Sequence, residues 1–127
     1  MKCYCGSEKE YSNCCEPFHK GNTYPSTSEE LMRSRYSAFC VKNIEYLVDT
    51  TDPQARTANT RDAYAEWANA AQFTGLEILN SKDDGNKGSV EFKAHYAMDG
   101  ETHLHHEASR FRKHQGTWYY REGRIKN

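Results

Sequence analysis

Residues 90–109 read Val-Glu-Phe-Lys-Ala-His-Tyr-Ala-Met-Asp-Gly-Glu-Thr-His-Leu-His-His-Glu-Ala-Ser, and they set the fold class. Apolar and polar residues alternate from Val90 to Met98, which is the period of a half-buried β-strand. Asp99-Gly100 then supplies a dipeptide typical of two-residue hairpin turns. The sequence therefore predicts two antiparallel strands joined by a tight turn.

The predicted turn also fixes which residues of the two strands face each other. The pairs are Met98 with Glu101, Tyr96 with His103, Ala94 with His105, Phe92 with Glu107, and Val90 with Ser109. The apolar face of one strand is thereby set beside histidines and a carboxylate of the next, which is unusual for a face that only packs on a core. We expect this face to border a site with polar chemistry.

The chain before this hairpin has a helical period. Thr27 and Glu30 form a capping box, which predicts a helix over residues 28–42. The apolar stripe of this helix contains Leu31, Met32, Tyr36, Phe39 and Cys40. Arg35 lies inside the stripe, so we expect a half-buried charge that needs a partner.

Two further helices and two further strands complete the prediction. Asn43 can cap a short second helix, and residues 60–72 carry apolar side chains at helical spacing. A strand from Thr74 leads to a turn at residues 83–85, and residues 117–121 form a last strand whose register the sequence does not fix. Helices followed by an antiparallel meander define an α+β architecture.

A chain of 127 residues has room for one domain and a small appendage. Its formal charge of −1 excludes strong global attraction of nucleic acid, and no apolar run approaches the roughly 20 residues of a membrane helix. The last eighteen residues are nevertheless basic, with Arg110, Arg112, Lys113, Arg121, Arg124 and Lys126 against Glu122. This C-terminal hairpin is either a solvated hairpin and tail or a surface for nucleic acid.

Four of the five cysteines lie in the first fifteen residues, namely Cys3, Cys5, Cys14 and Cys15. Two thiols one residue apart, a spacer of eight residues and two adjacent thiols form a loop short enough to bring four sulfurs around one ion. We interpret this segment as a zinc knuckle, with the four thiolates as metal ligands and Zn²⁺ as the cofactor.

Disulfides, free thiols, an iron–sulfur cluster and another soft metal are the alternative interpretations. A disulfide between Cys14 and Cys15 is disfavoured because adjacent Cα atoms are about 3.8 Å apart, below the usual minimum of about 4.4 Å. No apolar signal segment precedes the cysteines, which favours a reducing cytoplasm. His19 is an outside candidate ligand, and Cys40 fits a helix core better than a metal site.

The residues between the two cysteine pairs predict local structure. Gly6 suits a tight turn with positive φ. Ser7 and Glu10 match a capping box, which predicts a helix that starts at Glu8 and carries the second cysteine pair at its far end.

Two groups of motifs carry a resemblance to known proteins. The pattern Cys-x-Cys-Gly-Ser, followed after the spacer by Cys-Cys, resembles the SEC-C motif, the zinc-binding tail module of the translocation ATPase SecA. Residues 31–39, Leu-Met-Arg-Ser-Arg-Tyr-Ser-Ala-Phe, resemble the YchJ family of small bacterial proteins, as do Glu107-x-Ser109-x-Phe111 and Trp118-Tyr119-Tyr120.

This resemblance implies a fold like nuclear transport factor two, in which helices back a curved antiparallel sheet that encloses a conical pocket, as in a cystatin-like cone. We accordingly divide the chain into a SEC-C-like knuckle at residues 1–20 and an α+β cone domain at residues 27–127. Several family members carry a second SEC-C motif at the C-terminus, and residues 123–127 do not form one.

A cavity is expected inside the cone. Because Arg35 and Glu107 both lie on core-facing sides and buried charges need partners, we predict that they meet directly or through one water. The residues expected to line the cavity are Arg35, Tyr36, Trp67, Tyr96, His105 and Glu107. His105 and Glu107 have the types and the shared face of an acid–base pair, and equally of a structural hydrogen-bonded pair.

Two classes of function follow from the sequence. The first is a zinc-binding adaptor whose knuckle docks on a protein or ribonucleoprotein partner. The second is a small hydrolase- or isomerase-like enzyme, or a small-ligand binder, that uses the cone. The adaptor is favoured because no nucleophile elbow, phosphate loop or dinucleotide fingerprint is present.

Overall fold

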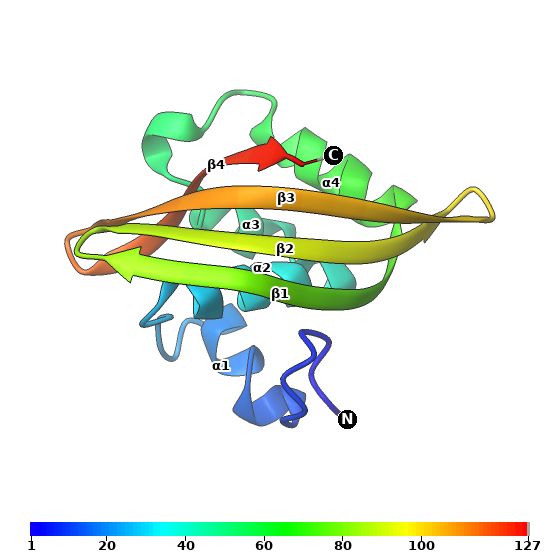
Figure 1. The fold of residues 1–127 in the computed structure, drawn as a ribbon, viewed down its shortest axis with the longest axis horizontal. Helices are drawn as coiled ribbons and strands as arrows, with labels where there is room; N and C mark the ends of the chain where they lie inside the picture. The colour runs from blue at the N-terminus through cyan, green and yellow to red at the C-terminus, as the bar shows by residue number, and fades with distance from the viewer. Residues whose placement is uncertain (127) are drawn as a thin grey trace.

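The computed structural model describes residues 1–126, and it combines helices in the first half of the chain with a four-stranded sheet in the second (Figure 1). The elements are η1 (Tyr11–Asn13), α1 (Glu16–His19), α2 (Ser28–Val41), α3 (Ile44–Asp49), η2 (Pro53–Ala55), α4 (Thr60–Ala70), β1 (Gln72–Asp84), β2 (Lys87–Met98), β3 (Glu101–His114) and β4 (Thr117–Ile125). Within this described part of the chain, no helix has the length and apolar character that a membrane crossing needs. The predicted α+β class is confirmed.

The sheet is an antiparallel meander in the order β1-β2-β3-β4. The predicted register between β2 and β3 is confirmed, because Phe92 pairs with Glu107 and Ala94 with His105. Asp99 and Gly100 have φ values of 55° and 79°, the positive φ at both central positions that a type I′ turn requires. A local turn signal thus brings the carboxylate of β3 beside the apolar residues of β2.

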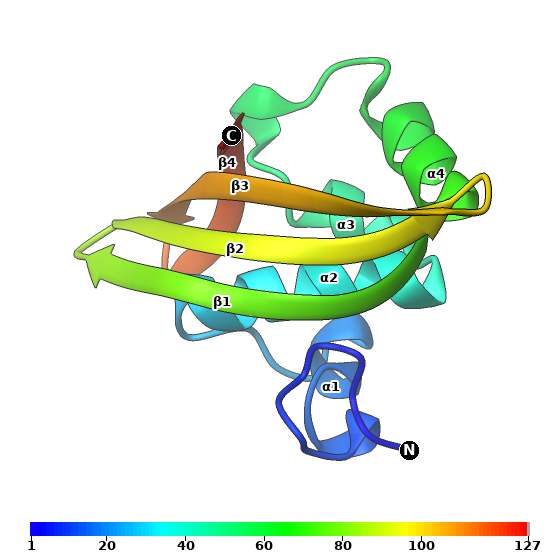
Figure 2. The same cartoon turned by 45° about the vertical axis from the view of Figure 1, so that its right-hand side comes forward.

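Helix α2 crosses one face of the curved sheet, and α3 and α4 extend this helical layer (Figures 1 and 2). The side chain of Thr27 accepts the N–H of Glu30, as expected for the first residue of a capping box. The core between α2 and the sheet consists of Leu31, Met32, Tyr36, Val90, Phe92, Ala94, Phe111 and Trp118. Burial of each large apolar side chain contributes about 1.5–3 kcal/mol, so this layer holds the helix against the sheet.

Several boundaries differ from the sequence-based prediction, and β1 starts at Gln72 rather than at Thr74. Helix α4 ends two residues before the predicted Gln72, because Ala71 adopts an extended conformation with φ −103° and ψ 142°. The turn between β1 and β2 lies at Gly85-Asn86 rather than at residues 83–85, with Gly85 at φ 62°. Strand β4 continues to Ile125, beyond the predicted residues 117–121.

A register shift fixes how β4 joins the sheet. The shift lies between Arg110 and Phe111 of β3, after which Phe111 pairs with Tyr120. On its other edge Tyr120 forms a parallel bridge with Thr51, from the segment that follows α3. The backbone of Tyr120 donates to the carbonyl of Thr50 at 2.7 Å and accepts from Asp52 at 2.8 Å. Strand β4 is therefore held between β3 and the helical layer.

The helix predicted from Glu8 is wrong. The chain instead reverses, Lys2 and Glu10 form an isolated antiparallel bridge, and both Gly6 and Glu8 have positive φ, at 81° and 71°. The Ser7 hydroxyl accepts the N–H of Lys9 rather than that of Glu10. A loop with two left-handed residues cannot continue as a helix, and helix α1 starts only after the second cysteine pair.

Candidate functional site

The four cysteines of the first segment converge in space. The Sγ atoms of Cys3, Cys5, Cys14 and Cys15 all lie within 4.8 Å of one another. Three of the side chains are buried, and that of Cys14 is half-buried. Hydrogen bonds from the Cys15 thiol, and weaker ones from Ser7, lower the pKa of Cys5 to about 4. The hydrogen bond to Cys5 and burial raise the pKa of Cys15, and burial raises that of Cys14, so Cys5 is the thiol of this hydrogen-bonded group that the loop favours as a thiolate.

The sulfur spacing fits a tetrahedral metal site. Metal–sulfur bonds of about 2.3 Å in a tetrahedron imply sulfur–sulfur separations of about 3.8 Å. The Sγ atoms of Cys5 and Cys14 are 3.6 Å apart, and those of Cys14 and Cys15 are 3.9 Å apart. The cluster can thus hold a metal ion through four thiolates.

The knuckle is hydrogen-bonded to helix α2. Arg33 of α2 donates from Nη1 to the carbonyl of Cys5 at 2.7 Å, which also places a positive charge near the thiols. The Sγ of Cys3 lies 3.5 Å from the hydroxyl of Ser37, and both groups are buried. Helix α2 of the cone domain therefore also holds the knuckle.

His19 is not in a position to serve as a metal ligand. Its Nε2 contacts the carbonyl of Ser34 at 2.8 Å, and its Nδ1 lies 2.6 Å from the hydroxyl of Tyr11. Burial lowers the pKa of His19, although the Ser34 carbonyl partly opposes this effect. Because a neutral ring donates only from one nitrogen, Nε2 donates to Ser34 and Nδ1 accepts from Tyr11. This histidine joins the knuckle to α2 instead.

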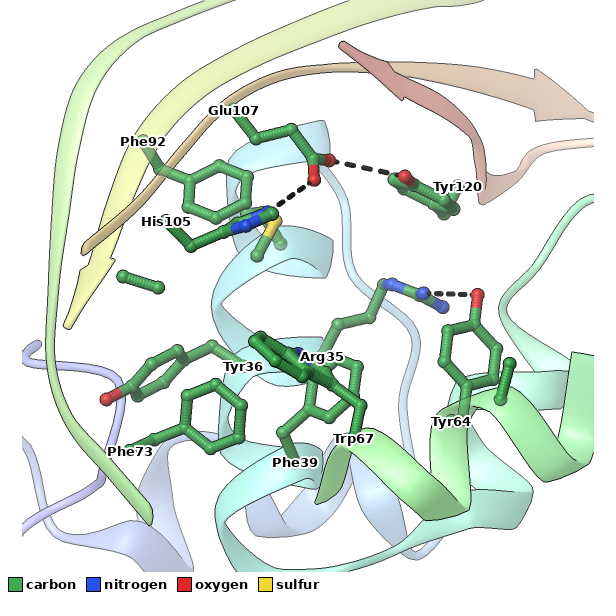
Figure 3. Close-up of a pocket in the computed structure, with 13 residues that line it drawn as sticks. Arg35, Tyr36, Phe39, Tyr64, Trp67, Phe73, Phe92, His105, Glu107 and Tyr120 are labelled. Atoms are coloured by element: carbon green, nitrogen blue, oxygen red, sulfur yellow. Dashed lines mark hydrogen bonds and ion pairs between the residues drawn. The ribbon is translucent and has the colours of Figure 1, made fainter. Parts of the chain in front are cut away.

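A cavity of about 250 Å³ lies inside the cone, between α2, α4 and the sheet (Figure 3). Its lining residues are Met32, Arg35, Tyr36, Phe39, Ala63, Tyr64, Trp67, Phe73, Phe92, Ala94, His105, Glu107 and Tyr120. Aromatic rings form most of the wall, and its polar groups come from α2, α4, β3 and β4. An apolar wall with a few convergent polar groups is the usual composition of a small-molecule site.

Arg35 is the buried cation of this cavity, with 3% of its surface exposed. Its Nη1 donates to the carbonyl of Leu47 at 2.9 Å and to the hydroxyl of Thr50 at 2.7 Å. Its Nη2 donates to the hydroxyl of Tyr64 at 2.8 Å. All these acceptors are neutral, and within the described residues Arg35 forms no ion pair with a carboxylate.

The predicted direct contact between Arg35 and Glu107 is not formed. The guanidinium instead lies over the ring of Tyr120, 4.5 Å from its centroid. The Tyr120 hydroxyl donates to Glu107 Oε2 at 3.2 Å. One aromatic ring thus joins the two charges, through a cation–π contact on its face and a hydrogen bond at its edge.

Glu107 accepts hydrogen bonds from three side chains. His105 Nε2 lies 2.8 Å from Oε1, while Ser109 and Tyr120 donate to Oε2. Burial alone would raise the pKa of Glu107, but these hydrogen bonds and the proximity of the imidazole hold it below its usual range. Since an ionised carboxylate only accepts, His105 donates to it from Nε2. Among the described residues, Nδ1 of His105 has no hydrogen-bond partner.

Gly123 makes room for this carboxylate. It pairs with Ser109 across the β3–β4 ladder. A Cβ at this position would collide with the carboxylate of Glu107, and it would lie 2.6 Å from the Tyr120 hydroxyl. The position therefore needs a residue without a side chain.

The structure gathers most of the residues named from the sequence. Arg35, Tyr36, Trp67, His105 and Glu107 line the cavity. Tyr96 does not line it; its ring packs against that of Trp67, with centroids 4.8 Å apart. Tyr96 therefore supports the wall from behind.

Two polar lining residues were not predicted. Tyr64 shares the helical stripe of Trp67, so the spacing could have placed it. Tyr120 could not be placed, because its orientation depends on the register shift in β3.

Two other histidines of β3, His103 and His106, form separate pairs. His106 lies 2.7 Å from Glu91, on the opposite face from His105, and His103 stacks on Tyr96. In the described part of the chain, the four cysteines are the one group with a metal-binding arrangement.

Fold and site together define a class: a cone domain like nuclear transport factor two, joined to an N-terminal SEC-C-type cysteine knuckle. Residues 27–123 match the family model described as YchJ, middle NTF2-like domain. The chain belongs to the YchJ family, which confirms the resemblance seen in the sequence.

Relatives agree with this membership. The chain is 39% identical over 125 residues to a UPF0225 protein of Actinobacillus succinogenes, covering 97% of this chain and 81% of that protein. It is similar to the solution structure of RPA3114, a SEC-C motif containing protein from Rhodopseudomonas palustris, with a TM-score of 0.93 and 40% identity over the whole of both chains. A SEC-C motif containing protein from Psychrobacter arcticus has a TM-score of 0.80 and 30% identity, covering 98% of this chain and 82% of that one.

Proposed function

We propose that the cone binds a small organic anion with an apolar body. The observation that carries this proposal is the cavity itself, in which a buried guanidinium without an anionic partner lies beside aromatic walls. The sequence favoured an adaptor role. The geometry gives more support to the ligand-binding alternative, because the polar groups converge on an internal space.

The cavity suits a molecule somewhat larger than benzene. Cavities of about 150 Å³ hold benzene-sized molecules, and this cavity measures about 250 Å³. Phe73, Phe92 and Trp67 supply flat apolar surfaces for the body of the ligand.

The polar end of the cavity favours a carboxylate or a similar anion. A guanidinium has five N–H donors. In Arg35, Nη1 and Nη2 donate only to neutral oxygens. An uncompensated buried charge costs several kcal/mol, which an anionic ligand would offset. The ionised Glu107 lines the same cavity and is held by His105, Ser109 and Tyr120, so the anionic group of the ligand has to lie at the Arg35 end, away from Glu107. Nδ1 of His105, which has no hydrogen-bond partner among the described residues, adds a further polar contact for the ligand.

Matched compounds test this proposal. A set of small aromatic carboxylates, with the corresponding primary amides and amines, is titrated against the protein by calorimetry and thermal shift. We expect the carboxylates to bind at least about tenfold more tightly, because a charged hydrogen bond adds about 1.5–3 kcal/mol. Ala63→Phe places a ring at the exposed edge of the cavity and should abolish binding. Ala70→Phe, on the same helix but away from the cavity, is the control.

Two results would contradict the proposal. Amides that bind as tightly as the carboxylates would remove the role of Arg35. Ala63→Phe that binds like Ala70→Phe would place the ligand outside the cone.

We propose zinc as the ion of the knuckle, held in a reducing cytoplasm. Zinc prefers four thiolates in a tetrahedron, and the sulfur spacing supports this geometry. Elemental analysis after reducing, metal-replete purification should give one zinc per chain. Visible charge-transfer bands would indicate iron instead.

A second candidate function is docking of the knuckle on a protein or ribonucleoprotein partner. A closed four-thiolate site has no open coordination position for chemistry. The knuckle exposes Tyr4, with 39% of its surface accessible, between Lys2 and Lys9. Tyr11 of the same loop is half-buried against His19, so it adds less to this surface than Tyr4 does.

Tyrosine variants test the docking. Tyr4→Ser should lose a specific partner in pull-downs while keeping its metal. Tyr24→Ser removes a tyrosine of 69% exposure outside the knuckle and should keep that partner. Identical partner sets for the two variants would exclude Tyr4 from docking.

A further inference from the structure

The β1–β2 and β3–β4 turns lie at the same end of the sheet (Figure 1). A groove lined by residues of β2, β3 and β4 lies there. It has a volume of about 520 Å³, and its cationic lining residues are Lys87, Arg110, Arg112, Lys113 and Arg121. A second groove of about 460 Å³ shares Arg110 and adds Arg124 and Lys126. We call this combined surface the basic groove.

The charge of the groove differs from that of the whole chain. Seven cations line it in the described residues, and Glu122 is the acidic side chain that lines it with them. The chain as a whole carries a formal charge of −1. The positive charge is therefore concentrated here, and such a surface attracts anions even on a protein without net positive charge.

A buried carboxylate holds two of these cations in place. Asp52 is fully buried, and its Oδ2 lies 3.1 Å from Arg112 Nε and 3.1 Å from Arg121 Nη1. Burial would raise the pKa of Asp52, but the Gln54 amide and the two guanidinium groups hold it below its usual range. The single negative charge of Asp52 thus holds the two guanidinium groups in place and neutralises only one of their two positive charges.

The two arginines reach the groove with only part of their side chains. Arg112 Nε is buried and lies 3.1 Å from Asp52 Oδ2, so this atom is not available to a ligand. The side chains of Arg112 and Arg121 are 35% and 42% exposed. Guanidinium groups held in fixed positions match the oxygens of phosphate and carboxylate groups.

The length of the groove favours a polymer over a single anion. Arg112 and Arg110 alternate along the outer face of β3, and Arg124 and Lys126 lie opposite Ala108 and His106 on the same face. From Arg112 to His106, at about 3.3 Å per residue, the row covers roughly 20 Å of strand. A row of cations of this length fits repeated phosphates. Phe111, the aromatic side chain in the lining, is buried and cannot stack on bases.

We infer that the basic groove binds the sugar–phosphate backbone of single-stranded nucleic acid without regard to its sequence. This site is separate from the cone cavity, and it does not depend on the ligand proposed there.

Salt-dependent binding tests the inference. Fluorescence anisotropy measures the binding of labelled single-stranded RNA and DNA of about 10 nucleotides to the protein. The salt concentration is varied between about 50 and 200 mM. The test variant Arg124→Ala/Lys126→Ala removes two exposed cations for which no ion pair is formed in the described residues. The control Lys9→Ala/Lys20→Ala removes two exposed cations elsewhere.

The wild-type protein and the control should bind oligonucleotides of different sequence with similar affinity. Each phosphate contact contributes about 0.7 to the slope of log K against log salt for single strands, so the test variant should lower that slope by about 1.4. Its affinity at low salt should fall about tenfold or more.

Three results would overturn the inference. The first is no binding by the wild-type protein at about 50 mM salt. The second is equal loss in the test and control variants. The third is displacement of the labelled oligonucleotide by a poly-glutamate peptide at a lower concentration than unlabelled oligonucleotide requires. That result would indicate that the groove binds an acidic protein.

Discussion

Metal removal should release the knuckle while leaving the cone domain folded but less stable. The perturbation is a strong chelator, or Cys14→Ser, which changes the least buried of the four ligands. Cys40→Ala serves as the control, because Cys40 lies in α2 outside the cluster. Structural zinc contributes on the order of 10 kcal/mol to its local fold, so residues before about Phe18 should become disordered.

The magnitude for the cone domain follows from the contacts that α2 would lose. These are the hydrogen bond of Arg33 to the Cys5 carbonyl at 2.7 Å and the contact of Ser37 with Cys3 at 3.5 Å. A hydrogen bond of a charged group contributes about 1.5–3 kcal/mol, and a neutral one about 1 kcal/mol. The sum is about 3 kcal/mol, which lowers the melting temperature by about 10 °C for a domain of this size. Since domains are stable by about 5–15 kcal/mol, the sheet should survive.

Differential scanning calorimetry and amide hydrogen exchange measure both effects. Protection should vanish in residues before about Phe18 and persist in β2 and β3. A chelated protein with an unchanged melting temperature would refute the reasoning, because the knuckle would then need no metal. Complete unfolding at room temperature would refute it in the opposite sense, because knuckle and cone would then form one cooperative unit.

Three further predictions concern the polar end of the cavity. The pKa of Glu107 is held below its usual range, so the ionised carboxylate stabilises the fold above its unfolded-state pKa, and this stabilisation is lost as the pH falls through its folded-state pKa. In urea unfolding from pH 6 to pH 3, the free energy of unfolding should therefore fall more steeply in the wild type than in Glu107→Gln. Tyr120→Phe removes one hydrogen bond but keeps the ring under Arg35, so it should cost about 1 kcal/mol, and Tyr120→Leu should cost more in the same assay; equal costs would contradict the cation–π contact. Gly123→Ala should destabilise the fold by about 1–3 kcal/mol through overpacking, and combining it with Glu107→Ala should recover part of that loss; strict additivity would contradict the proposed collision.

The hairpin between β2 and β3 was predictable because its signals are local. An alternating pattern on one side of Asp99-Gly100 fixes the register by itself. The burial of Arg35 was equally readable from the helical wheel. Its partners were not, because Leu47 and Tyr64 lie 12 and 29 residues further along the chain.

Non-local pairing explains the part of the site that the sequence did not predict. The position of Tyr120 depends on the register shift between Arg110 and Phe111, and on the bridge to Thr51. Neither has a local signal. In the knuckle, the capping-box pattern at Ser7 and Glu10 gave a wrong prediction of a helix. The loop that brings the thiols together instead requires residues with left-handed backbone conformations.

The absence of a side chain at Gly123 has a use in comparing relatives. Its backbone occupies the space next to the Glu107 carboxylate, so the two positions are sterically dependent on each other. A family member that keeps an acid at the position of Glu107 should keep glycine at that of Gly123, although the two positions are not neighbours in the sequence. A member in which that glycine is replaced should also have replaced the acid, and its cone would then present a different charge to its ligand. Position 123 thus offers a marker, readable without a structure, for sorting relatives by the chemistry of their cavity.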